Sequence, residues 1–306
     1  MNISADTVKE LRKRTQAGFM ECKKALEEAK GDIEKAITII RKRGVALANK
    51  RAERAAKEGL VGIAEASTPA GGCVALFELN AETDFVTQNE MFQKAATAIT
   101  RTLSRFLSTQ PAKGLTLIQA REIKLTDKDT PEKSWQKLTV LDLTQQLAGV
   151  IGEKIDLSRV TSLVSKPGEH IVTYAHAGNK VVAAVRLQVG SASTDVVKAV
   201  GKDLAMQVVA SSPQYLGPPD VPPEELSKEK EVYLSQVIAS GKPKEIAEKI
   251  VIGKLKNFYQ QACLTEQPFI KDPKISVSQY LDQSSKTSGQ KIQILGFVRL
   301  ACGENS

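Results

Sequence analysis

The chain has 306 residues, of which 42% are apolar and 25% are charged, as expected for a soluble globular protein of about two domains. The formal charge of +8 is uneven, because residues 1–57 hold 15 basic and 8 acidic side chains, a net +7. No apolar run approaches the roughly 20 residues of a membrane helix, and the first residues lack a signal-segment pattern. The four cysteines have no metal-ligand spacing, so we expect reduced thiols in a cytoplasmic protein.

The first 57 residues predict three short helices and then a basic connecting helix. Apolar residues recur at helical spacing over 5–14, 19–30 and 33–40. Gly31-Asp32 supplies a helix stop followed by an N-cap. We expect the third helix to end before Gly44 and an Ala-rich basic helix to occupy 45–57.

The charge and the exposed apolar residues of this segment leave alternatives open. A solvated charged face is favoured over a nucleic-acid stripe for Lys50, Arg54 and Lys57, because no aromatic residues interleave with them. Phe19 and Met20 follow a glycine, and they either cap the small helical core or face a partner.

From Gly59 onward the pattern changes to that of two hairpin-plus-helix units. Strands over 60–65 and 73–79 flank a turn-rich 68–72, and a helix follows at 89–107. Residues 108–140 have no readable pattern. A second hairpin over 170–187 is followed by a helix at 194–211, which suggests two related α+β subdomains.

The last third predicts a helical hairpin and a final strand. The arms are 224–240 and 243–262, and the strand is 292–300. We expect the arms to pack through the following residues: Val232, Leu234 and Ile238 against Ile246, Ile250 and Val251.

Four stretches of the chain carry motifs that occur together in one family. The first is L-R-K-R-T-Q-A-G-F-M-E-C-K-K-A-L at 11–26, and the second is Thr83-Asp84-Phe85-Val86 after a hairpin strand. The third is Tyr174-Ala175-His176, and the fourth is 241–251 with 264–269 downstream. Each motif alone is weak, but the ordered set spans nearly the whole chain. The chain therefore resembles the bacterial translation elongation factor Ts family.

This resemblance implies an α+β fold: a ubiquitin-associated-like (UBA-like) three-helix domain, a core of two α+β subdomains with small antiparallel sheets, and a protruding helical-hairpin coiled coil. By position, the UBA-like domain and connecting helix take 1–57, and the first subdomain takes 58–150. The second subdomain takes 151–215 with 264–306, and the coiled coil takes 216–263. Because little chain follows the last strand, the extra C-terminal helix of some members is expected to be absent.

The resemblance also implies a guanine-nucleotide exchange factor that binds elongation factor Tu·GDP, disturbs its magnesium and nucleotide site, and promotes GDP release so that GTP can bind. Thr83, Asp84, Phe85 and Val86 would dislocate the Mg²⁺ ion of that GTPase. The other partner contacts would be Leu11, Phe19, Met20, His176 and Ile270. We expect no enzyme activity, cofactor, metal or direct nucleotide binding. We also expect no membrane partner, and no nucleic acid is required. A 2:2 assembly is left open.

The residues themselves allow other interpretations of the same positions. From spacing alone, Phe85 is favoured as a core aromatic at a strand end, and Asp84 as a turn or helix cap. His176 is favoured as a structural or surface residue over a catalytic base, because no nucleophile motif or Gly-rich phosphate loop accompanies it. An RNA-binding or ribosome-associated module remains the competing class, and an enzyme ranks third.

Overall fold

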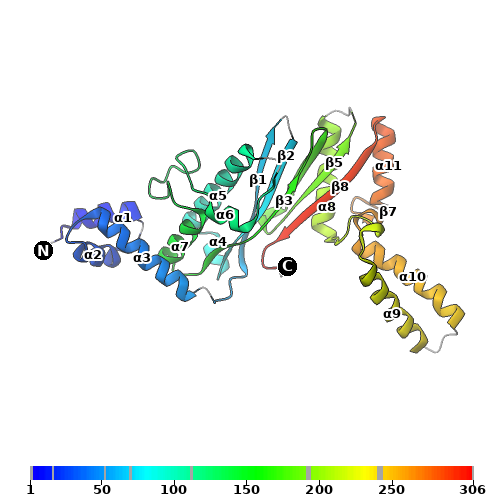
Figure 1. The fold of residues 1–306 in the computed structure, drawn as a ribbon, viewed down its shortest axis with the longest axis horizontal. Helices are drawn as coiled ribbons and strands as arrows, with labels where there is room; N and C mark the ends of the chain where they lie inside the picture. Colours follow the sequence, from blue (N-terminus) through cyan, green and yellow to red (C-terminus); the bar gives the residue numbers. More distant parts are fainter. Residues whose placement is uncertain are drawn as a thin grey trace. The chain divides into compact units, whose positions relative to one another are not determined.

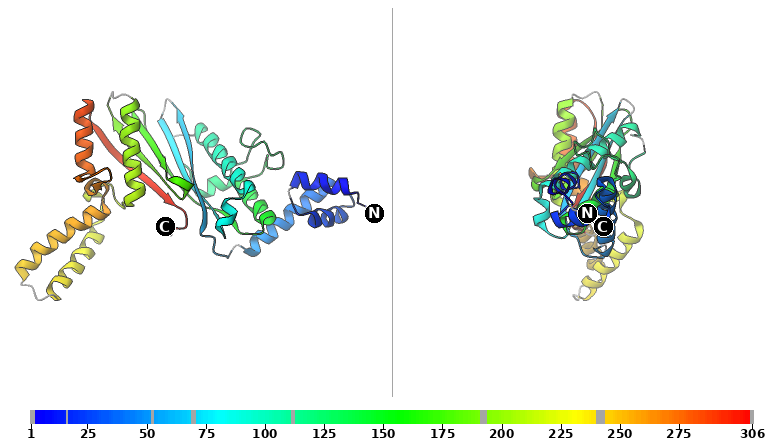
Figure 2. Two further views of the ribbon diagram at one scale, coloured as in Figure 1. Left: turned by 180° about the vertical axis from the view of Figure 1, so that it is seen from behind. Right: turned by 90° about the vertical axis from the view of Figure 1, so that its left-hand side faces the viewer.

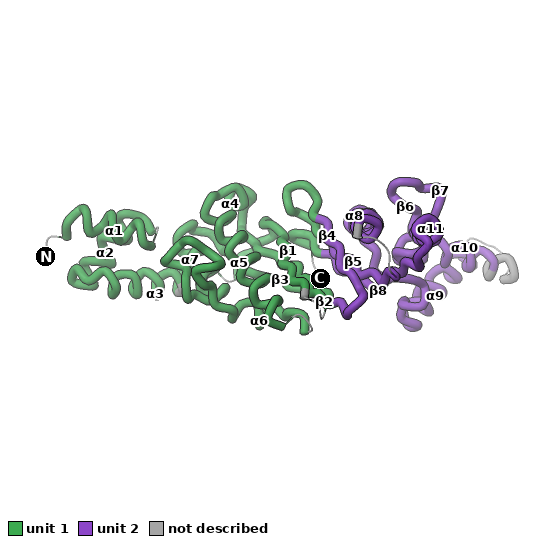
Figure 3. Tube along the Cα trace, turned by 90° about the horizontal axis from the view of Figure 1, so that it is seen from above, with its two compact units in different colours: residues 1–164, 175–182, 300–306 green, residues 165–174, 183–299 purple. Residues whose placement is uncertain are grey.

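The computed structural model describes residues 3–15, 17–51, 53–68, 71–110, 113–190, 194–239 and 244–304. The chain is α+β and divides into two compact units, which Figure 3 distinguishes by colour. Unit 1 comprises residues 1–164, 175–182 and 300–306, and unit 2 comprises 165–174 and 183–299. The turn expected at 68–72 lies partly outside the described residues, and the one at 240–243 lies entirely outside them.

Unit 1 begins with three helices, α1 (Ala5–Thr15), α2 (Phe19–Glu28) and α3 (Ile33–Arg51), as predicted (Figure 1). The three helices share one apolar core. Its most buried residues are Val8, Leu11, Ala17, Cys22, Ala25, Leu26 and Ala36. The predicted stop between α2 and α3 is confirmed, because Gly31 has a φ of 88° and the Asp32 carboxylate accepts the Lys35 N–H at 3.0 Å.

The expected break at Gly44 is wrong, because α3 continues through it to Arg51. Gly44 is buried where α3 packs on α7 (Val140–Ile151), and the facing residue on α7 is Gly149. Two helices can approach this closely only where neither presents a bulky side chain. The glycine therefore marks a helix crossing. The predicted helix at 45–57 is in part the end of α3, and residues 53–57 are not helical.

The sheet of unit 1 has the strand order β1-β2-β3, all antiparallel, with β1 at Glu58–Thr68, β2 at Gly71–Ala81 and β3 at Ile155–Val164. The first two strands form the predicted hairpin. Helix α5 (Glu90–Thr109) and helix α7 cover one face of this sheet, as the rear view in Figure 2 shows. The buried rings of Phe77 and Phe92 lie in the core between them.

The segment that the sequence left unassigned, 108–140, is organised around one buried carboxylate. It holds the short helix α6 (Leu117–Glu122) and a bridge between Lys124 and Thr139. Asp129 is only 2% exposed and accepts hydrogen bonds from the Arg105 guanidinium, from the Thr126 N–H and from the Thr126 hydroxyl. Burial alone would raise the pKa of Asp129, but these donors hold it below its ordinary value.

A second sheet has the order β4-β5-β8, with β4 at Glu169–Ala175, β5 at Val181–Val189 and β8 at Ile292–Ala301. A short 3₁₀ turn, η1 (Ala177–Asn179), joins β4 to β5, and this turn belongs to unit 1. Within unit 2, α8 (Thr194–Ser211) and α11 (Val277–Ser288) pack on the sheet. The second hairpin and its helix are confirmed, whereas α11 was not predicted.

The helical hairpin of unit 2 is formed by α9 (Pro223–Ala239) and α10 (Lys244–Ala262), close to the predicted arms (Figure 1). Its predicted packing is wrong in part, because Val232 and Ile238 are 48% and 53% exposed. The predicted Val251 on α10 is buried, and Leu234 on α9 is half-buried. Val237 on α9 and Leu255 on α10 are also buried, and neither was predicted. The side chain of Ile246 lies outside the description.

The ends of this hairpin are joined to the rest of unit 2 by short elements. These are η2 (Pro218–Asp220), η3 (Leu264–Glu266), β6 (Pro268–Phe269) and β7 (Asp272–Ser276). The fully buried Gln207 of α8 donates to the Gln267 side chain and accepts the Ile270 N–H at 2.7 Å. A satisfied buried amide of this kind fixes the path of the chain leaving the hairpin.

The crossing of α3 and α7 predicts an asymmetric response to alanine. A Cβ at Gly149 would lie 2.9 Å from the Gly44 Cα, whereas a Cβ at Gly44 would meet nothing closer than the Gln145 oxygen at 3.8 Å. We therefore expect Gly149→Ala to lower the free energy of unfolding by about 1–3 kcal/mol. Gly44→Ala is the matched control and should be neutral or stabilising by up to about 1 kcal/mol. Urea unfolding of both variants measures the difference; equal effects would contradict a close crossing.

The buried Asp129 predicts a pH-dependent contribution to stability. Because its pKa is lower in the folded chain, its contribution is fully present above about pH 4–5 and is lost as the pH falls through the lowered pKa. Asp129→Asn should therefore lower the free energy of unfolding by about 1–3 kcal/mol at pH 7. The difference from the wild-type chain should shrink below pH 4. Denaturant unfolding between pH 3 and 7 tests this, and a pH-independent difference would exclude it.

Candidate functional site

The Thr83–Val86 motif forms a short turn between the end of β2 and the start of α5. Helix α4 covers only Asp84–Thr87, with Thr83 at its N-cap. The Thr87 hydroxyl donates to the Asp84 carbonyl at 2.6 Å, and the Asn89 side chain accepts the Met91 N–H at 2.9 Å to begin α5. The motif is therefore a compact single turn tied directly to a long core helix.

Phe85 and its neighbour Val86 have opposite environments within this turn. Val86 is 6% exposed and packs in the main core of unit 1, whereas Phe85 is 83% exposed. The spacing-based interpretation of Phe85 as a core aromatic is therefore wrong. Asp84 is also exposed, so the two side chains that the resemblance singles out are both accessible to a partner.

Thr83 does not use its side chain to cap α4. Its hydroxyl donates to Glu153 Oε1 at 2.7 Å, and its N–H donates to Glu153 Oε2 at 2.9 Å. Glu153 lies in the loop between α7 and β3, just after Gly152. Glu153 is not among the site residues predicted from the sequence. A carboxylate directly after a helix-ending glycine was the only local signal for it.

The turn after β4 belongs to the same unit and carries His176. His176 is exposed, and its backbone N–H donates to the Val181 carbonyl at 2.9 Å. Lys180, at the end of this turn, pairs with Glu58 at 2.8 Å. Burial lowers the pKa of Lys180, but the hydrogen bond to Glu58 and nearby negative charges, including that of Asp84, raise it overall. The Asp84 carboxylate and the turn that carries His176 thus interact electrostatically.

The remaining predicted partner contacts lie in the three-helix part of unit 1 and in unit 2. Phe19 and Met20, at the start of α2, are 44% and 59% exposed, which favours a partner-facing role over a core cap. Ile270, in unit 2, is 45% exposed. Leu11 is fully buried in the three-helix core, so its side chain supports that surface from inside instead of forming part of it.

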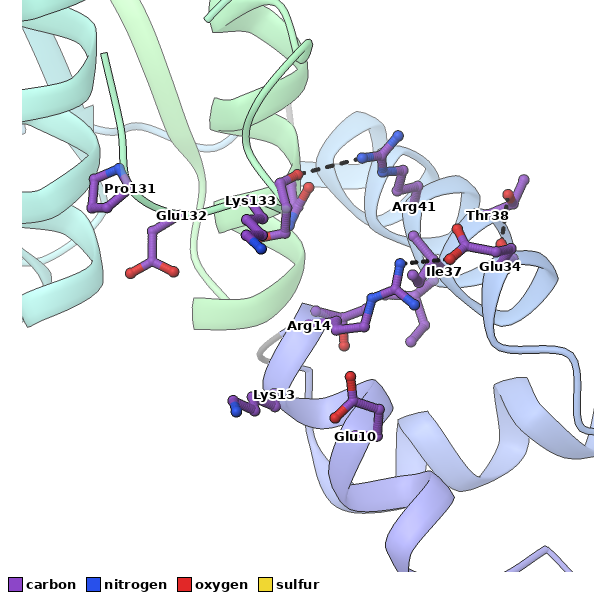
Figure 4. A pocket seen from close by; sticks show the side chains of 14 residues that line it. Glu10, Lys13, Arg14, Glu34, Ile37, Thr38, Arg41, Pro131, Glu132 and Lys133 are labelled. Carbon is purple, nitrogen blue, oxygen red and sulfur yellow. Dashed lines mark hydrogen bonds and ion pairs between the residues drawn. The ribbon is translucent and has the colours of Figure 1, made fainter. Parts of the chain in front are cut away.

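Several arginines of the basic first segment already have partners within the chain. Arg14 pairs with Glu34, Arg43 with Glu28 and Arg54 with Glu82. The Arg14–Glu34 pair lines a hollow of about 760 Å³, whose other charged residues are the basic Lys13, Arg41 and Lys133 and the acidic Glu10 and Glu132 (Figure 4). A lining of both signs does not match the uniformly basic groove expected for nucleic acid.

Within the described ranges, no group of three or more His, Cys, Asp or Glu side chains is arranged to hold a metal ion. In the same ranges, none of the helices is both long and apolar enough to cross a membrane. The features that stand out are therefore exposed apolar side chains on rigid supports, which suit contact with another macromolecule.

Comparison with known proteins gives a consistent result. The model of the family described as "Elongation factor TS" matches residues 82–304. Elongation factor Ts of Chloroherpeton thalassium is 40% identical over 304 residues, covering 99% of both chains. Elongation factor Ts of Syntrophotalea carbinolica is 37% identical, covering 99% of this chain and 94% of the relative. Elongation factor Ts of Chlamydia muridarum is 38% identical over 97% of each chain.

Phe85 is exposed and Phe92 is buried, so replacing each by alanine should change the stability of the fold by very different amounts. Phe85→Ala removes an exposed ring and should change the free energy of unfolding by no more than about 0.5 kcal/mol. Phe92→Ala removes a fully buried ring from the main core of unit 1 and should lower the free energy of unfolding by about 3–5 kcal/mol. Thermal and urea unfolding followed by circular dichroism test this. A large loss for Phe85→Ala would mean that its ring packs in the fold.

Proposed function

Because the chain belongs to the elongation factor Ts family, we propose that it is the guanine-nucleotide exchange factor of the GTPase elongation factor Tu. Its family membership makes the chain a translation elongation factor, which acts in protein synthesis. In the proposed reaction it binds the GDP-bound GTPase, disturbs the magnesium and nucleotide site, and promotes GDP release so that GTP can bind. The factor makes and breaks no covalent bond and binds no nucleotide itself.

The observation that carries this proposal is the exposed Phe85 on a turn anchored at both ends. An exchange factor works by binding a conformation of its partner that nucleotide disfavours, and the coupling is reciprocal. Burying one Phe side chain against the partner supplies roughly 1.5–3 kcal/mol. Since about 1.4 kcal/mol is a factor of ten in rate, Phe85 accounts for one to two decades of release. Other contacts supply the remainder.

Asp84 has a different role in the proposed complex. Its exposed carboxylate brings a negative charge beside Phe85, where the Thr83–Val86 turn dislocates the Mg²⁺ ion of the GTPase. A hard cation such as Mg²⁺ prefers oxygen ligands in near-ideal geometry, so a carboxylate and an inserted ring together disturb its coordination.

The other contacts enlarge the proposed interface from separate places. Phe19 and Met20 bind the GTPase from the start of α2, with Leu11 supporting them from the core below. His176 contributes from the turn after β4, and Ile270 contributes from unit 2. We place the exchange reaction in the cytoplasm, where protein synthesis takes place.

Replacing Phe85 tests the proposed role of the turn. Phe85→Ala should slow factor-stimulated GDP release by about tenfold or more, because the buried area of the ring is lost from the complex. Stopped-flow release of a fluorescent GDP from elongation factor Tu measures the rate. Ile118→Ala is the matched control, because Ile118 is 77% exposed on α6 and lies outside the proposed contacts.

The control should leave the rate within about twofold of the wild-type value, because no binding area is removed. An unchanged rate in Phe85→Ala would exclude the turn as the site of exchange. The wild-type chain should also capture the GTPase and release it when GDP is added. Tight RNA binding with a steep salt dependence, and no GDP-sensitive capture, would instead support the competing RNA-binding function.

A further inference from the structure

Two loops of unit 1 exchange hydrogen bonds reciprocally beside the Thr83–Val86 turn. Glu153, after α7, accepts the Thr83 N–H at 2.9 Å and the Thr83 hydroxyl at 2.7 Å. Glu82, just before the turn, accepts the Lys154 N–H at 2.7 Å. Each loop therefore offers a carboxylate to the backbone of the other, and we call these four residues the carboxylate clamp.

The clamp is built on rigid parts of the fold. Helix α7 is buried along its inner face at Leu143 and Leu147, and it ends at Gly152, whose φ of 91° turns the chain toward Thr83. The Gly152 N–H and the Arg51 guanidinium both donate to the Ala148 carbonyl, at 3.1 and 2.8 Å. Because the last turn of α7 is fixed in this way, Glu153 leaves the helix in a defined direction.

The N-terminal end of the turn has no side-chain cap of its own. A helix of four residues satisfies few of its own hydrogen bonds and is unstable in isolation. Thr83 occupies the N-cap, yet its hydroxyl is directed to Glu153 and makes no capping bond. Between Thr83 and the buried Val86 lie the exposed Asp84 and Phe85. The carboxylate clamp is therefore the first anchor of this turn, and Val86 is the second.

We propose that Glu153 is a positioning residue for nucleotide exchange, which holds Thr83 so that Asp84 and Phe85 are presented in a fixed geometry. This inference rests on the proposed exchange function. Hydrogen bonds to a charged acceptor are about twice as strong as neutral ones, so one carboxylate with two donors is an effective restraint. Without it, the turn would have to be ordered as Asp84 and Phe85 enter the nucleotide site, and the cost of that ordering would add to the barrier for GDP release.

The other half of the clamp connects it to the segment after α3. Arg54 contacts both carboxylate oxygens of Glu82 at 3.3 Å, and the Lys154 ammonium donates to the Arg54 carbonyl at 3.0 Å. The turn is therefore held from β2, from the α7–β3 loop and from the basic segment together. Of the groups in this network, Glu153 is the one that accepts hydrogen bonds from Thr83, which makes it the residue to change.

The test compares Glu153→Ala with the conservative Glu153→Gln. Alanine removes both acceptors, whereas glutamine keeps an oxygen for the Thr83 N–H and an amide that can donate to the Thr83 hydroxyl. With stopped-flow release of fluorescent GDP from elongation factor Tu, we expect Glu153→Ala to lower the maximal rate about tenfold. The half-saturating concentration should change less than threefold, because the other contacts remain. Glu153→Gln should stay within about threefold of the wild-type maximal rate.

Two further variants separate positioning from stability. Thr83→Val keeps the shape but loses the hydroxyl donor, and its effect should disappear in the Glu153→Ala background, as expected for groups that act through one contact. Glu90→Ala removes a nearby carboxylate that pairs only with Lys94 in an exposed i, i+4 pair, and it should leave the rate unchanged. Circular dichroism confirms that each variant is folded.

The outcomes distinguish the two proposals. If the wild-type chain does not stimulate GDP release, the exchange function fails. If it does, and folded Glu153→Ala matches the wild-type rate, the positioning role of Glu153 is wrong. Equal losses in Glu153→Ala and Glu153→Gln would also overturn it, because charge and not geometry would then matter. Should Glu153→Ala fail to fold, an unchanged maximal rate for Thr83→Val would refute the proposal.

Discussion

The burial of Val86 beside the exposed Phe85 is the contact on which the candidate site depends. An aromatic ring that is 83% exposed gains nothing from its own surroundings, so its position is set entirely by its neighbours in the chain. Val86 lies in a core shared by β2, α5 and α7, and it attaches the C-terminal end of the turn to that core. The sheet and the two helices packed on it thus hold a single exposed turn in place.

Local patterns in the sequence were sufficient for most helices and hairpins but not for Gly44. The apolar stripe Ala36, Ile40 and Gly44 continues at four-residue spacing, and glycine was interpreted as its end because glycine commonly follows helices. The reason for a glycine at this position is Gly149, more than a hundred residues later, against which Gly44 packs. The amphipathic signal of α11 was also weak, because only Val277 and Leu281 of that polar helix are buried.

The same distinction applies to the candidate site. Thr83, Asp84, Phe85 and Val86 could be found as a contiguous motif, but their opposite exposures required the fold. Glu153 is separated from Thr83 by 70 residues, and a hydrogen bond over that distance leaves no periodicity to detect. The net charge of the first segment was visible, whereas its pairing with Glu28, Glu34 and Glu82 was not. Of these three pairs, only Arg54–Glu82 uses a carboxylate from outside residues 1–57, so most of the basic excess of that segment remains.

Because α3 is uninterrupted, the number of residues between its two contacts is fixed. One stripe of this helix supplies Ala36 and Ile40 to the three-helix core and then Gly44 to the crossing with α7. Each residue of an α-helix advances the azimuth by about 100°. An insertion or deletion of one residue between Ile40 and Gly44 would therefore direct the two ends of the stripe to different sides. Sequences that share this arrangement can vary the side chains on the outer face of α3, but they have to conserve the number of residues between its two contacts.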